Sequence, residues 1–466
     1  MTELGNSQGL GSGMEQDGRR DAGAVIVAAV RDGRVPGAVA AVGRGQDTAA
    51  VWVAGRADTT PGAETLMRAG TLFDLASLTK VVGTATAVLA LAGSGGLGLD
   101  DPAGRYLPSF GALRAVTVRQ LLAHTSGLPD TRRFYEWCTS REELLRDLHA
   151  TPLEAPPGTR VTYSDLGFMA LGEIVARVAG EPLEVAVGDL VTGPLNMLRT
   201  RYYTEYGAEI VMGWRARQPG AAIGGCAHEG RGGAGEGPGG AGEGPGSAGE
   251  GPGSAASAGA GHGDHRRAEE GDGYAATERK PDGTPWAGVV HDENARLMGG
   301  VAGHAGLFAP VADLATFAAW WAGEDDVAVP AWLRREADRL QTAGLDGCRG
   351  LGWVRQGDRY DILRGTWPPG SVSHTGFTGT SLAVDPATGT WAVLLTNSVH
   401  FGRDPARIRA LRREFHAALA PSAPSAPSIP SAPSAPSAPG PPSATGTSSA
   451  PRAGERGRGP ARQRES

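Results

Sequence analysis

The residues best suited to chemistry are a serine and a lysine three positions apart, Ser77 and Lys80. Only two of the 44 basic residues are lysine, and the other one, Lys280, lies in a charged turn. A partly buried lysine can lose its proton and act as a base, whereas an arginine stays charged. Side chains three residues apart are neighbours on a helix, so Lys80 could take the hydroxyl proton of Ser77. The sequence therefore predicts a serine nucleophile; the alternative is that Ser77 caps the helix while Lys80 reaches solvent.

Two further segments carry groups that suit the same site. Tyr163 and Asp165 lie in a polar turn, where a phenol near an ammonium can act as a base and a neighbouring carboxylate can hold that ammonium. Taken alone, this segment is better interpreted as a plain turn with Asp165 as the N-cap of a helix. The third segment, residues 374–380, leads into a strand. Its glycines, Gly376 and Gly379, would let a ligand approach the backbone, where an amide could donate to an oxyanion.

The elements expected around these segments place strands at both ends of the ordered chain and helices between them. Residues 38–42 and 50–54 form a β-like pair, and residues 380–385 and 391–396 form another, each joined by residues typical of a hairpin. The stretch from residue 77 to about 200 has mainly helical patterns. We expect an α+β fold in which N- and C-terminal strands form one antiparallel sheet flanked by helices, with a mostly helical lobe inserted between them.

This pattern also predicts the domain boundaries. The ordered domain is expected to span residues 21–420, preceded by a disordered segment, residues 1–20. The α/β lobe is expected to comprise residues 21–76 and 300–420, and the helical lobe is expected to comprise residues 77–299.

Two low-complexity tracts interrupt or follow this domain. Residues 218–273 are rich in glycine and contain a repeated seven-residue unit with no aliphatic side chain larger than alanine. Residues 421–466 form a tail rich in proline, serine and alanine. Segments of this composition cannot bury enough apolar surface to offset the entropy lost on ordering. We therefore predict that both tracts are disordered.

Composition excludes several classes of protein. The net charge is −6, with acids and bases interspersed, so no nucleic-acid partner is expected. Three cysteines are too few and too scattered for a disulfide framework or a cysteine-based zinc site. Residues 291–294, His-Asp-Glu-Asn, include metal-ligand types, but adjacent residues on one segment cannot converge on an ion without partners, so they are interpreted as a polar loop bordering the cleft. No metal and no cofactor are predicted.

A membrane span is not expected either. The uncharged stretch 81–99 nominally reaches spanning length, but it contains five glycines and starts directly after Lys80. It is better interpreted as a buried helix that ends in a glycine turn. The first residues carry an acid and small polar side chains where a signal peptide would have basic residues and an apolar core. We therefore expect a cytoplasmic protein.

Taken together, the three segments resemble the motifs of the penicilloyl-serine hydrolase superfamily. The resemblance is to its branch of class C β-lactamases, D-alanyl-D-alanine carboxypeptidases and related esterases. That family carries Ser-x-x-Lys, then Tyr-x-Asn, then Lys/His-Thr/Ser-Gly, in this order and at similar spacing. Further stretches that resemble the family are 71–80, 121–128, 194–197 and 299–308. The resemblance covers about residues 21–420, apart from the glycine-rich insertion.

The resemblance implies a covalent mechanism in which Ser77 attacks a carbonyl and forms an acyl-enzyme that water later hydrolyses. Lys80 and Tyr163 would share the general-base and general-acid duties. The backbone amides of Ser77 and Phe377 would form the oxyanion hole. The residues assigned to substrate binding or the oxyanion hole are Asp165, His374, Thr375, Gly376 and Phe377.

Two departures from the family pattern bear on the substrate. Asp165 stands where many members have asparagine, and His374 stands where β-lactamases usually have lysine. An imidazole is largely neutral at pH 7, so a fixed cation for a substrate carboxylate is missing. Both variants are similar to the esterase-type branch, which favours uncharged small esters or amides over carboxylate-bearing β-lactams.

Alternative functions remain. The first is β-lactamase or D-Ala-D-Ala carboxypeptidase activity on the same site. The second is a non-catalytic relative that uses the fold for binding or assembly. The presence of Ser77, Lys80 and Tyr163 together favours a catalyst. The expected partner is thus a small-molecule ester, amide or β-lactam, and the sequence indicates no protein partner.

Overall fold

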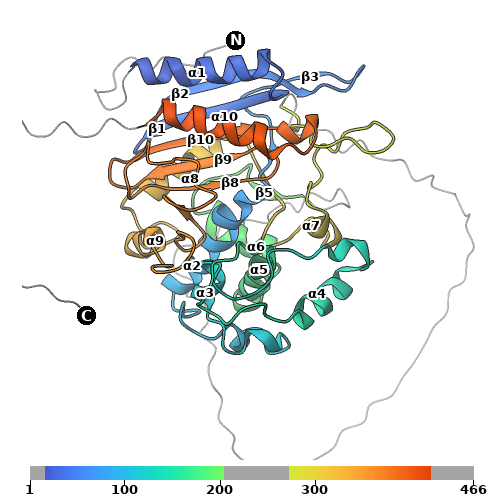
Figure 1. Cartoon of the computed structure of the whole chain (residues 1–466), viewed down its shortest axis with the longest axis vertical. Helices are drawn as coiled ribbons and strands as arrows, with labels where there is room; N and C mark the ends of the chain where they lie inside the picture. Colours follow the sequence, from blue (N-terminus) through green and yellow to red (C-terminus); the bar gives the residue numbers. More distant parts are fainter. Residues whose placement is uncertain (1–15, 204–271, 421–466) are drawn as a thin grey trace, which may run out of the picture. The chain divides into compact units, whose positions relative to one another are not determined.

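The computed structural model describes residues 16–203 and 272–420, which belong to one compact unit. Its main sheet is antiparallel, with the strand order β3-β2-β1-β10-β9-β8-β7 (Figure 1). These strands are β1 (Gly37–Arg44), β2 (Asp47–Asp58), β3 (Thr65–Leu66), β7 (Val354–Arg355), β8 (Val372–Thr375), β9 (Ser381–Asp385) and β10 (Thr390–Thr396). A smaller sheet has the order β4-β6-β5, formed by β4 (Phe73–Asp74), β5 (Arg201–Tyr202) and β6 (Leu307–Ala309).

The main sheet joins the two ends of the described chain, as the sequence predicted. Strand β1 pairs with β2 on one side and with β10 on the other, and Ala41 faces both Val51 and Val393. The expected α+β fold is therefore confirmed. Every residue of β1 except Arg44 is buried, because helices cover both faces of the sheet. Alternate residues of the strand point to opposite faces, so Val39 joins one core cluster and Ala40 joins the other.

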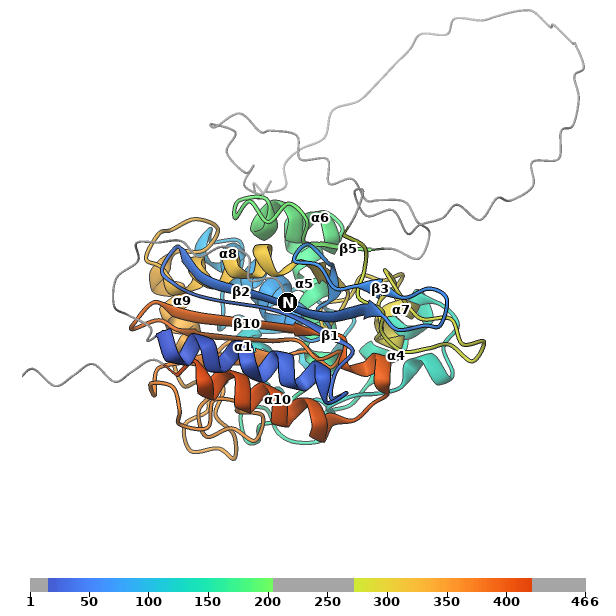
Figure 2. The same ribbon diagram turned by 90° about the horizontal axis from the view of Figure 1, so that it is seen from above.

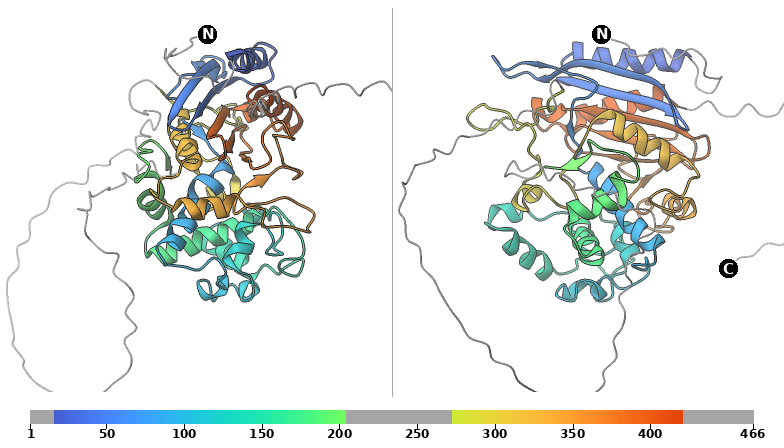
Figure 3. Two further views of the ribbon diagram at one scale, coloured as in Figure 1. Left: turned by 90° about the vertical axis from the view of Figure 1, so that its left-hand side faces the viewer. Right: turned by 180° about the vertical axis from the view of Figure 1, so that it is seen from behind.

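Helices α1 (Gln16–Arg31) and α10 (Pro405–Ala418) lie side by side over one face of this sheet (Figure 2). Helix α8 (Val311–Ala322) packs against the opposite face, as the rear view in Figure 3 shows. Its aromatic residues Phe317 and Trp321 are fully buried in the core. The sheet is thus the middle layer between two helical layers.

Helix α1 starts earlier than the sequence suggested. Residues 16–20 belong to the helix, although residues 1–20 were predicted to be disordered. The helix is held by Ala22, Ile26 and Ala29, which follow a helical spacing and are fully buried in the core that includes α10. Residues 1–15 lie outside the described part of the chain.

The other helices form the lobe below the sheet in Figure 1. They are α2 (Thr86–Gly93), α3 (Val118–Leu122), α4 (Arg141–Ala150), α5 (Asp165–Ala179), α6 (Leu183–Val187), α7 (Glu293–Leu297) and α9 (Ala331–Asp338), and a π-helical segment, η1 (Lys80–Ala85), precedes α2. All residues from Lys80 to Leu91 are buried. The expected buried helix ending in a glycine turn is confirmed, because α2 ends at Gly93 and Gly95 adopts a φ of 78°. Among residues 16–203 and 272–420, no helix combines the length and the apolar character needed to cross a membrane.

The predicted low-complexity tracts fall almost entirely outside the described residues. The tail, residues 421–466, lies outside them completely, and so does the stretch 218–271. The last two residues of the predicted glycine-rich tract, however, are described and make contacts. Asp272 forms an ion pair with Arg199 at 3.1 Å, and the carbonyl of Gly273 accepts a hydrogen bond from the amide of Leu72. Asp272 and Gly273, which the prediction placed in the disordered tract, therefore contact the domain.

Candidate active site

Ser77 lies in a series of tight turns between strand β4 and the π-helical segment η1. The amides of residues 78, 79 and 80 donate to the carbonyls three residues earlier, so Ser77 precedes the first helical turn instead of belonging to it. Ala76 adopts a φ of 46°, in the left-handed region that non-glycine residues seldom occupy. Its amide donates to Asp74 Oδ1 at 2.8 Å, which holds the turn in this conformation. Strained backbone of this kind is concentrated at functional sites.

Lys80 is fully buried and reaches back to Ser77. Its Nζ donates to Ser77 Oγ at 2.9 Å and to the carbonyl of His304 at 3.1 Å. It also forms an ion pair with Asp165 Oδ1 at 2.8 Å. Burial by itself lowers the pKa of Lys80, but the charge of Asp165 and the phenol of Tyr163 outweigh burial and leave the pKa raised. Lys80 is therefore an ammonium at neutral pH.

Tyr163 completes the contacts of this pair. Lys80 Nζ lies 5.1 Å from the centre of its ring, and the guanidinium carbon of Arg349 lies 5.3 Å from it. Burial raises the pKa of Tyr163, and hydrogen bonds with Ser77 and Lys80 oppose that rise. The phenol consequently keeps its proton at neutral pH and can give it to a partner. His124 packs against the same ring at 4.6 Å and accepts a hydrogen bond from the Ser164 amide, in line with its predicted backbone contact.

The predicted turn around Asp165 differs in one respect from the sequence interpretation. Ser164 is the N-cap of α5, because its hydroxyl accepts a hydrogen bond from the amide of Gly167. Asp165 is the first residue of the helix, and its carboxylate faces Lys80. The helix start thus places the carboxylate within reach of the ammonium.

His374 is buried next to the same cations. Its Nδ1 lies 3.0 Å from the carbonyl of Thr375, and since a carbonyl only accepts, Nδ1 carries the proton. Nε2 is buried without a hydrogen-bond partner in the described part of the protein. Burial, followed by the charges of Lys80 and Arg349, holds the pKa of His374 well below its usual range. The imidazole is therefore neutral, as the sequence analysis expected.

The loop after β8 is fastened to the loop that carries Ser77. Thr378 Oγ1 donates to the carbonyl of Asp74 at 2.7 Å, and Thr380 Oγ1 donates to the carbonyl of Leu75 at 3.1 Å. A Cβ on Gly376 would lie 2.2 Å from that same Leu75 oxygen. The glycine is thus required by the contact between the two loops, whereas the sequence analysis assigned it to the approach of a ligand.

This contact also brings together the two amides predicted to bind an oxyanion. Neither the amide of Ser77 nor that of Phe377 donates a hydrogen bond to another described residue. Phe377 is half exposed, and its ring stacks on His291 at 5.6 Å. The backbone of His291 in turn donates to Asp74 Oδ2 at 2.6 Å. Asp74 therefore connects the Ser77 turn with the segment that supports Phe377.

The side chains of residues 291–294 contact different partners. His291 lies 3.0 Å from Glu278, Asp292 lies 2.9 Å from His304, Glu293 pairs with Arg403 at 2.6 Å and Asn294 donates to the carbonyl of Arg132 at 2.7 Å. The side chain of His304 pairs with Asp292, and its carbonyl accepts a hydrogen bond from Lys80. No three His, Cys, Asp or Glu side chains in the described ranges come together in a way that could hold a metal ion.

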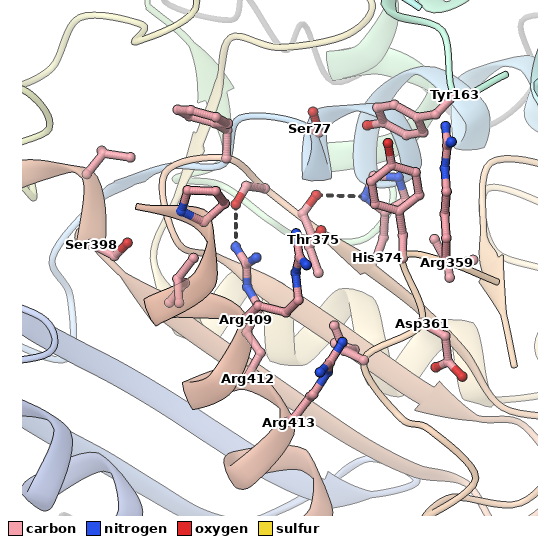
Figure 4. A pocket seen from close by; sticks show the side chains of 18 of the residues that line it. Ser77, Tyr163, Arg359, Asp361, His374, Thr375, Ser398, Arg409, Arg412 and Arg413 are labelled. Atoms are coloured by element: carbon pink, nitrogen blue, oxygen red, sulfur yellow. Dashed lines mark hydrogen bonds between the residues drawn. The ribbon is translucent and has the colours of Figure 1, made fainter. Parts of the chain in front are cut away.

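Ser77 opens onto a pocket that reaches the start of α10 (Figure 4). The pocket is partly open to solvent and lined by both polar and apolar side chains, as sites for small organic molecules usually are. Tyr163, His374, Thr375, Gly376 and Phe377 line it together with Ser77, so the structure gathers the predicted residues at one place. Lys80 and Asp165 lie behind Ser77 and Tyr163.

The sequence model of the family described as Beta-lactamase matches residues 22–417. The chain belongs to the β-lactamase family. The match covers both sides of the pocket, from the Ser77 turn to helix α10, and agrees with the resemblance drawn from the motifs.

Individual relatives of this β-lactamase-family protein carry different names. It is 28% identical over 351 residues to the "Putative D-alanyl-D-alanine carboxypeptidase" of Escherichia coli (strain K12), covering 71% of this chain and 70% of that protein. It is 38% identical over 200 residues to Esterase EstB of Burkholderia gladioli, covering 37% of this chain and 49% of the esterase. A solved class C β-lactamase superposes with a TM-score of 0.59 at 18% identity, covering 86% of this chain and 96% of that one, which shows the shared fold.

Motif reasoning missed one feature of this β-lactamase-family protein. Six arginines line the pocket: Arg349, Arg359, Arg403, Arg409, Arg412 and Arg413. Three of them lie on α10, where the sequence Arg-Ala-Leu-Arg-Arg at 409–413 repeats arginine at helical spacing. That spacing was visible in the sequence, but only the packing of α10 beside β8 and its loop shows that this face borders the pocket.

Proposed function

We propose that this protein is a serine hydrolase that cleaves small esters or amides through an acyl-enzyme on Ser77. The observation that carries the proposal is the 2.9 Å hydrogen bond between Lys80 Nζ and Ser77 Oγ in a buried site. The β-lactamase family assignment supports the same reaction class. The expected cytoplasmic location stays a prediction.

The proton movements follow from the charges of the site. Lys80 holds a proton and can accept another only after it releases one, either to Asp165, whose Oδ1 lies 2.8 Å away, or to solvent as the pH rises. Ser77 loses its proton to Lys80 as Oγ bonds to the carbonyl carbon. The bond from that carbon to the leaving oxygen or nitrogen then breaks, and the leaving group takes the proton of the neutral Tyr163 phenol. Tyr163 regains a proton from Lys80, and Lys80 regains one from Asp165, which closes the proton balance.

The negative charge that develops on the carbonyl oxygen is assigned to the amides of Ser77 and Phe377, which have no other acceptor among the described residues. Such donors act strongly because they are already oriented before the reaction. Water then attacks the acyl-enzyme by the reverse sequence of proton transfers, with the products being an acid and free Ser77.

The decisive experiment is Ser77→Ala, assayed with p-nitrophenyl butyrate and by intact-mass spectrometry. We expect hydrolysis to fall by about 10³-fold or more and the acyl adduct to disappear, because the hydroxyl of Ser77 is the pocket hydroxyl to which Lys80 donates. Ser109→Ala is the matched control, since Ser109 is exposed and bonds to His149 in the helical lobe. Undiminished hydrolysis by Ser77→Ala would refute the proposal.

Two further results of the same assay distinguish the hydrolase proposal from the alternative functions. Hydrolysis of nitrocefin far faster than that of the ester by the unmodified protein would favour β-lactamase activity. Absence of any acyl adduct with esters, amides and β-lactams would favour a non-catalytic relative.

A further inference from the structure

We propose that Asp74 is a positioning residue that holds the amides of Ser77 and Phe377 at the spacing needed to bind one oxyanion. This inference rests on the proposed hydrolase function, because it names a further residue on which that same reaction depends. Asp74 is almost completely buried and is not among the residues that line the pocket. It would therefore act through the two amides and not by touching the substrate.

One carboxylate oxygen of Asp74 fixes the turn that presents Ser77. Asp74 Oδ1 accepts a hydrogen bond from the amide of Ala76 at 2.8 Å. Ala76 has a φ of 46°, and such a conformation persists in a non-glycine residue only where the surroundings hold it. The peptide plane that follows Ala76 contains the amide of Ser77. The direction of that amide therefore depends on the contact with Asp74.

The other carboxylate oxygen holds the segment that supports Phe377. Asp74 Oδ2 accepts a hydrogen bond from the amide of His291 at 2.6 Å, across 217 positions of the sequence. The ring of His291 stacks on the ring of Phe377, with the centroids 5.6 Å apart and the planes at 23°. The two oxygens of one carboxylate thus serve the two sides of the predicted oxyanion hole.

The backbone of Asp74 adds a third link to the same loop. Its carbonyl accepts a hydrogen bond at 2.7 Å from Oγ1 of Thr378, the residue that follows Phe377. Asp74 also belongs to strand β4, where it pairs with Phe308 of β6. A residue on a paired strand is a firmer support than one in a free loop. Asp74 is therefore placed to fix the distance between the Ser77 turn and the loop after β8.

A carboxylate suits this position because both of its oxygens are acceptors, so each can receive a backbone amide. The isosteric asparagine could accept at one oxygen only, and its amino group would face the second amide as another donor. Within residues 16–203 and 272–420, Asp74 forms no ion pair with an arginine or a lysine. The contacts of its side chain thus favour orientation of the backbone over neutralisation of a charge.

The position of the two amides should affect the rate more than the binding of substrate. An oxyanion hole stabilises the charge that develops in the transition state, and it does so because its donors are oriented in advance. A displaced donor therefore lowers kcat, whereas KM changes little. A purely structural role of Asp74 would reduce stability without this pattern.

The first test is Asp74→Asn, assayed with p-nitrophenyl butyrate. The substitution keeps the size of the side chain and breaks one of its two amide contacts. We expect kcat to fall about 10- to 100-fold, with KM within about threefold of its original value, as for partial loss of an oxyanion donor. The melting temperature shows whether the variant is folded.

A thiono ester provides a readout that a structural defect would not move. In p-nitrophenyl thionobutyrate a sulfur replaces the carbonyl oxygen, and sulfur is a weak hydrogen-bond acceptor. The unmodified protein should therefore prefer the oxygen ester by a factor that includes the contribution of the two amides. In Asp74→Asn we expect this preference to fall about 5- to 10-fold, because the amides no longer converge on one atom.

The matched control is Asp385→Asn. Asp385 is also fully buried, and it accepts hydrogen bonds from the amide of Ala387 and the hydroxyl of Thr388 in the hairpin between β9 and β10. It is not among the pocket residues. This variant should keep both kcat and the preference for the oxygen ester, even if its melting temperature falls.

Thr378→Val is the second variant, and it decides the question if Asp74→Asn does not fold. It preserves the carboxylate and removes the hydroxyl that donates to the carbonyl of Asp74. The changes in kcat and in the preference should have the same direction as in Asp74→Asn, with a smaller size.

Three results would overturn the inference. They are an unchanged kcat in the folded variant, a lower kcat with an unchanged preference for the oxygen ester, and an equal loss of preference in Asp385→Asn. The hydrolase proposal is tested separately, because hydrolysis by the unmodified protein and its loss in Ser77→Ala do not depend on the role of Asp74.

Discussion

Lys80, which lies behind the pocket, and Arg412, which lines it, are buried cations with different surroundings. Lys80 is fully buried with a carboxylate, that of Asp165, 2.8 Å away. Arg412 is almost as buried, and its hydrogen-bond acceptors among the described residues are the carbonyls of Gly376 and Thr380. Burying a charge without a countercharge costs folding free energy. The fold bears this cost at Arg412, whereas the carboxylate of Asp165 reduces it at Lys80.

The difference shows which cation can move a proton. Lys80 has both a hydroxyl and a carboxylate within hydrogen-bonding distance. Its Nζ can therefore take a proton from the hydroxyl on one side and pass a proton to the carboxylate on the other. Arg412 has only carbonyl acceptors and, as a guanidinium, does not give up its proton in a protein. One cation therefore suits the chemical step, and the other holds the loop after β8 through its carbonyls.

The largest effect that would test this comparison is expected from Lys80→Arg. The substitution keeps the positive charge but removes the group that exchanges protons, so kcat/KM for p-nitrophenyl butyrate should fall by about 10² to 10⁴-fold. Lys80→Ala serves as the second variant and should be similarly inactive. Near-normal rates with arginine at this position would show that Lys80 provides charge alone.

A smaller effect is expected from Asp165→Asn, measured as the pH profile of kcat/KM. Asp165 favours the ammonium form and is the main partner that holds the pKa of Lys80 above its usual value against burial. Without that charge the pKa of Lys80 falls, so the unprotonated amine appears at lower pH. The rising limb of the profile that depends on Lys80 should move down by about one pH unit or more.

A shift of the rising limb to lower pH is expected only if Lys80 acts as the base. An unchanged limb would show that a different group controls the profile. Asp292→Asn is a useful second variant, because Asp292 pairs with His304 and not directly with Lys80. It should move the limb less than Asp165→Asn does.

The smallest effect is expected for the stability of Arg412→Met, with Arg349→Met as its matched control. Arg349→Met leaves Asp358 buried without a partner, and the free energy of unfolding should fall by about 3 to 5 kcal/mol. Arg412→Met leaves no charge unpaired and relieves the burial of a cation, so the change should stay within about 1 kcal/mol. Urea unfolding of both variants is the measurement, and equal losses would contradict the distinction between paired and unpaired arginines.

Much of this site could be anticipated from residue types and their order. The scarcity of lysine singled out Lys80, and the spacing placed Ser77 beside it. The periodicity of two in the terminal segments predicted the strands that meet as β1 and β10. These features depend on local rules, in which neighbours in sequence are neighbours in space.

Other features could not be predicted because they depend on contacts between distant segments. Gly376 is needed where its loop meets the carbonyl of Leu75, a contact across some 300 residues that no local pattern contains. The start of α1 was missed because the burial of this helix, through Ala22, Ile26 and Ala29, depends on α10 at the other end of the described chain. The residue pattern left Asp165 as either an N-cap or a partner of the ammonium, and only the packing of α5 directs its carboxylate to Lys80.

The sequence by itself determined the chemistry available to this protein: one serine, one rare lysine, one tyrosine and the order in which they occur. The tertiary structure decided their charge states and the character of the pocket. Burial and neighbouring charges set the pKa values of Lys80, Tyr163 and His374, and both depend on segments brought together only by folding. The arginines of α10 became part of the pocket for the same reason, since a helix pattern shows which residues share a face but not what that face meets.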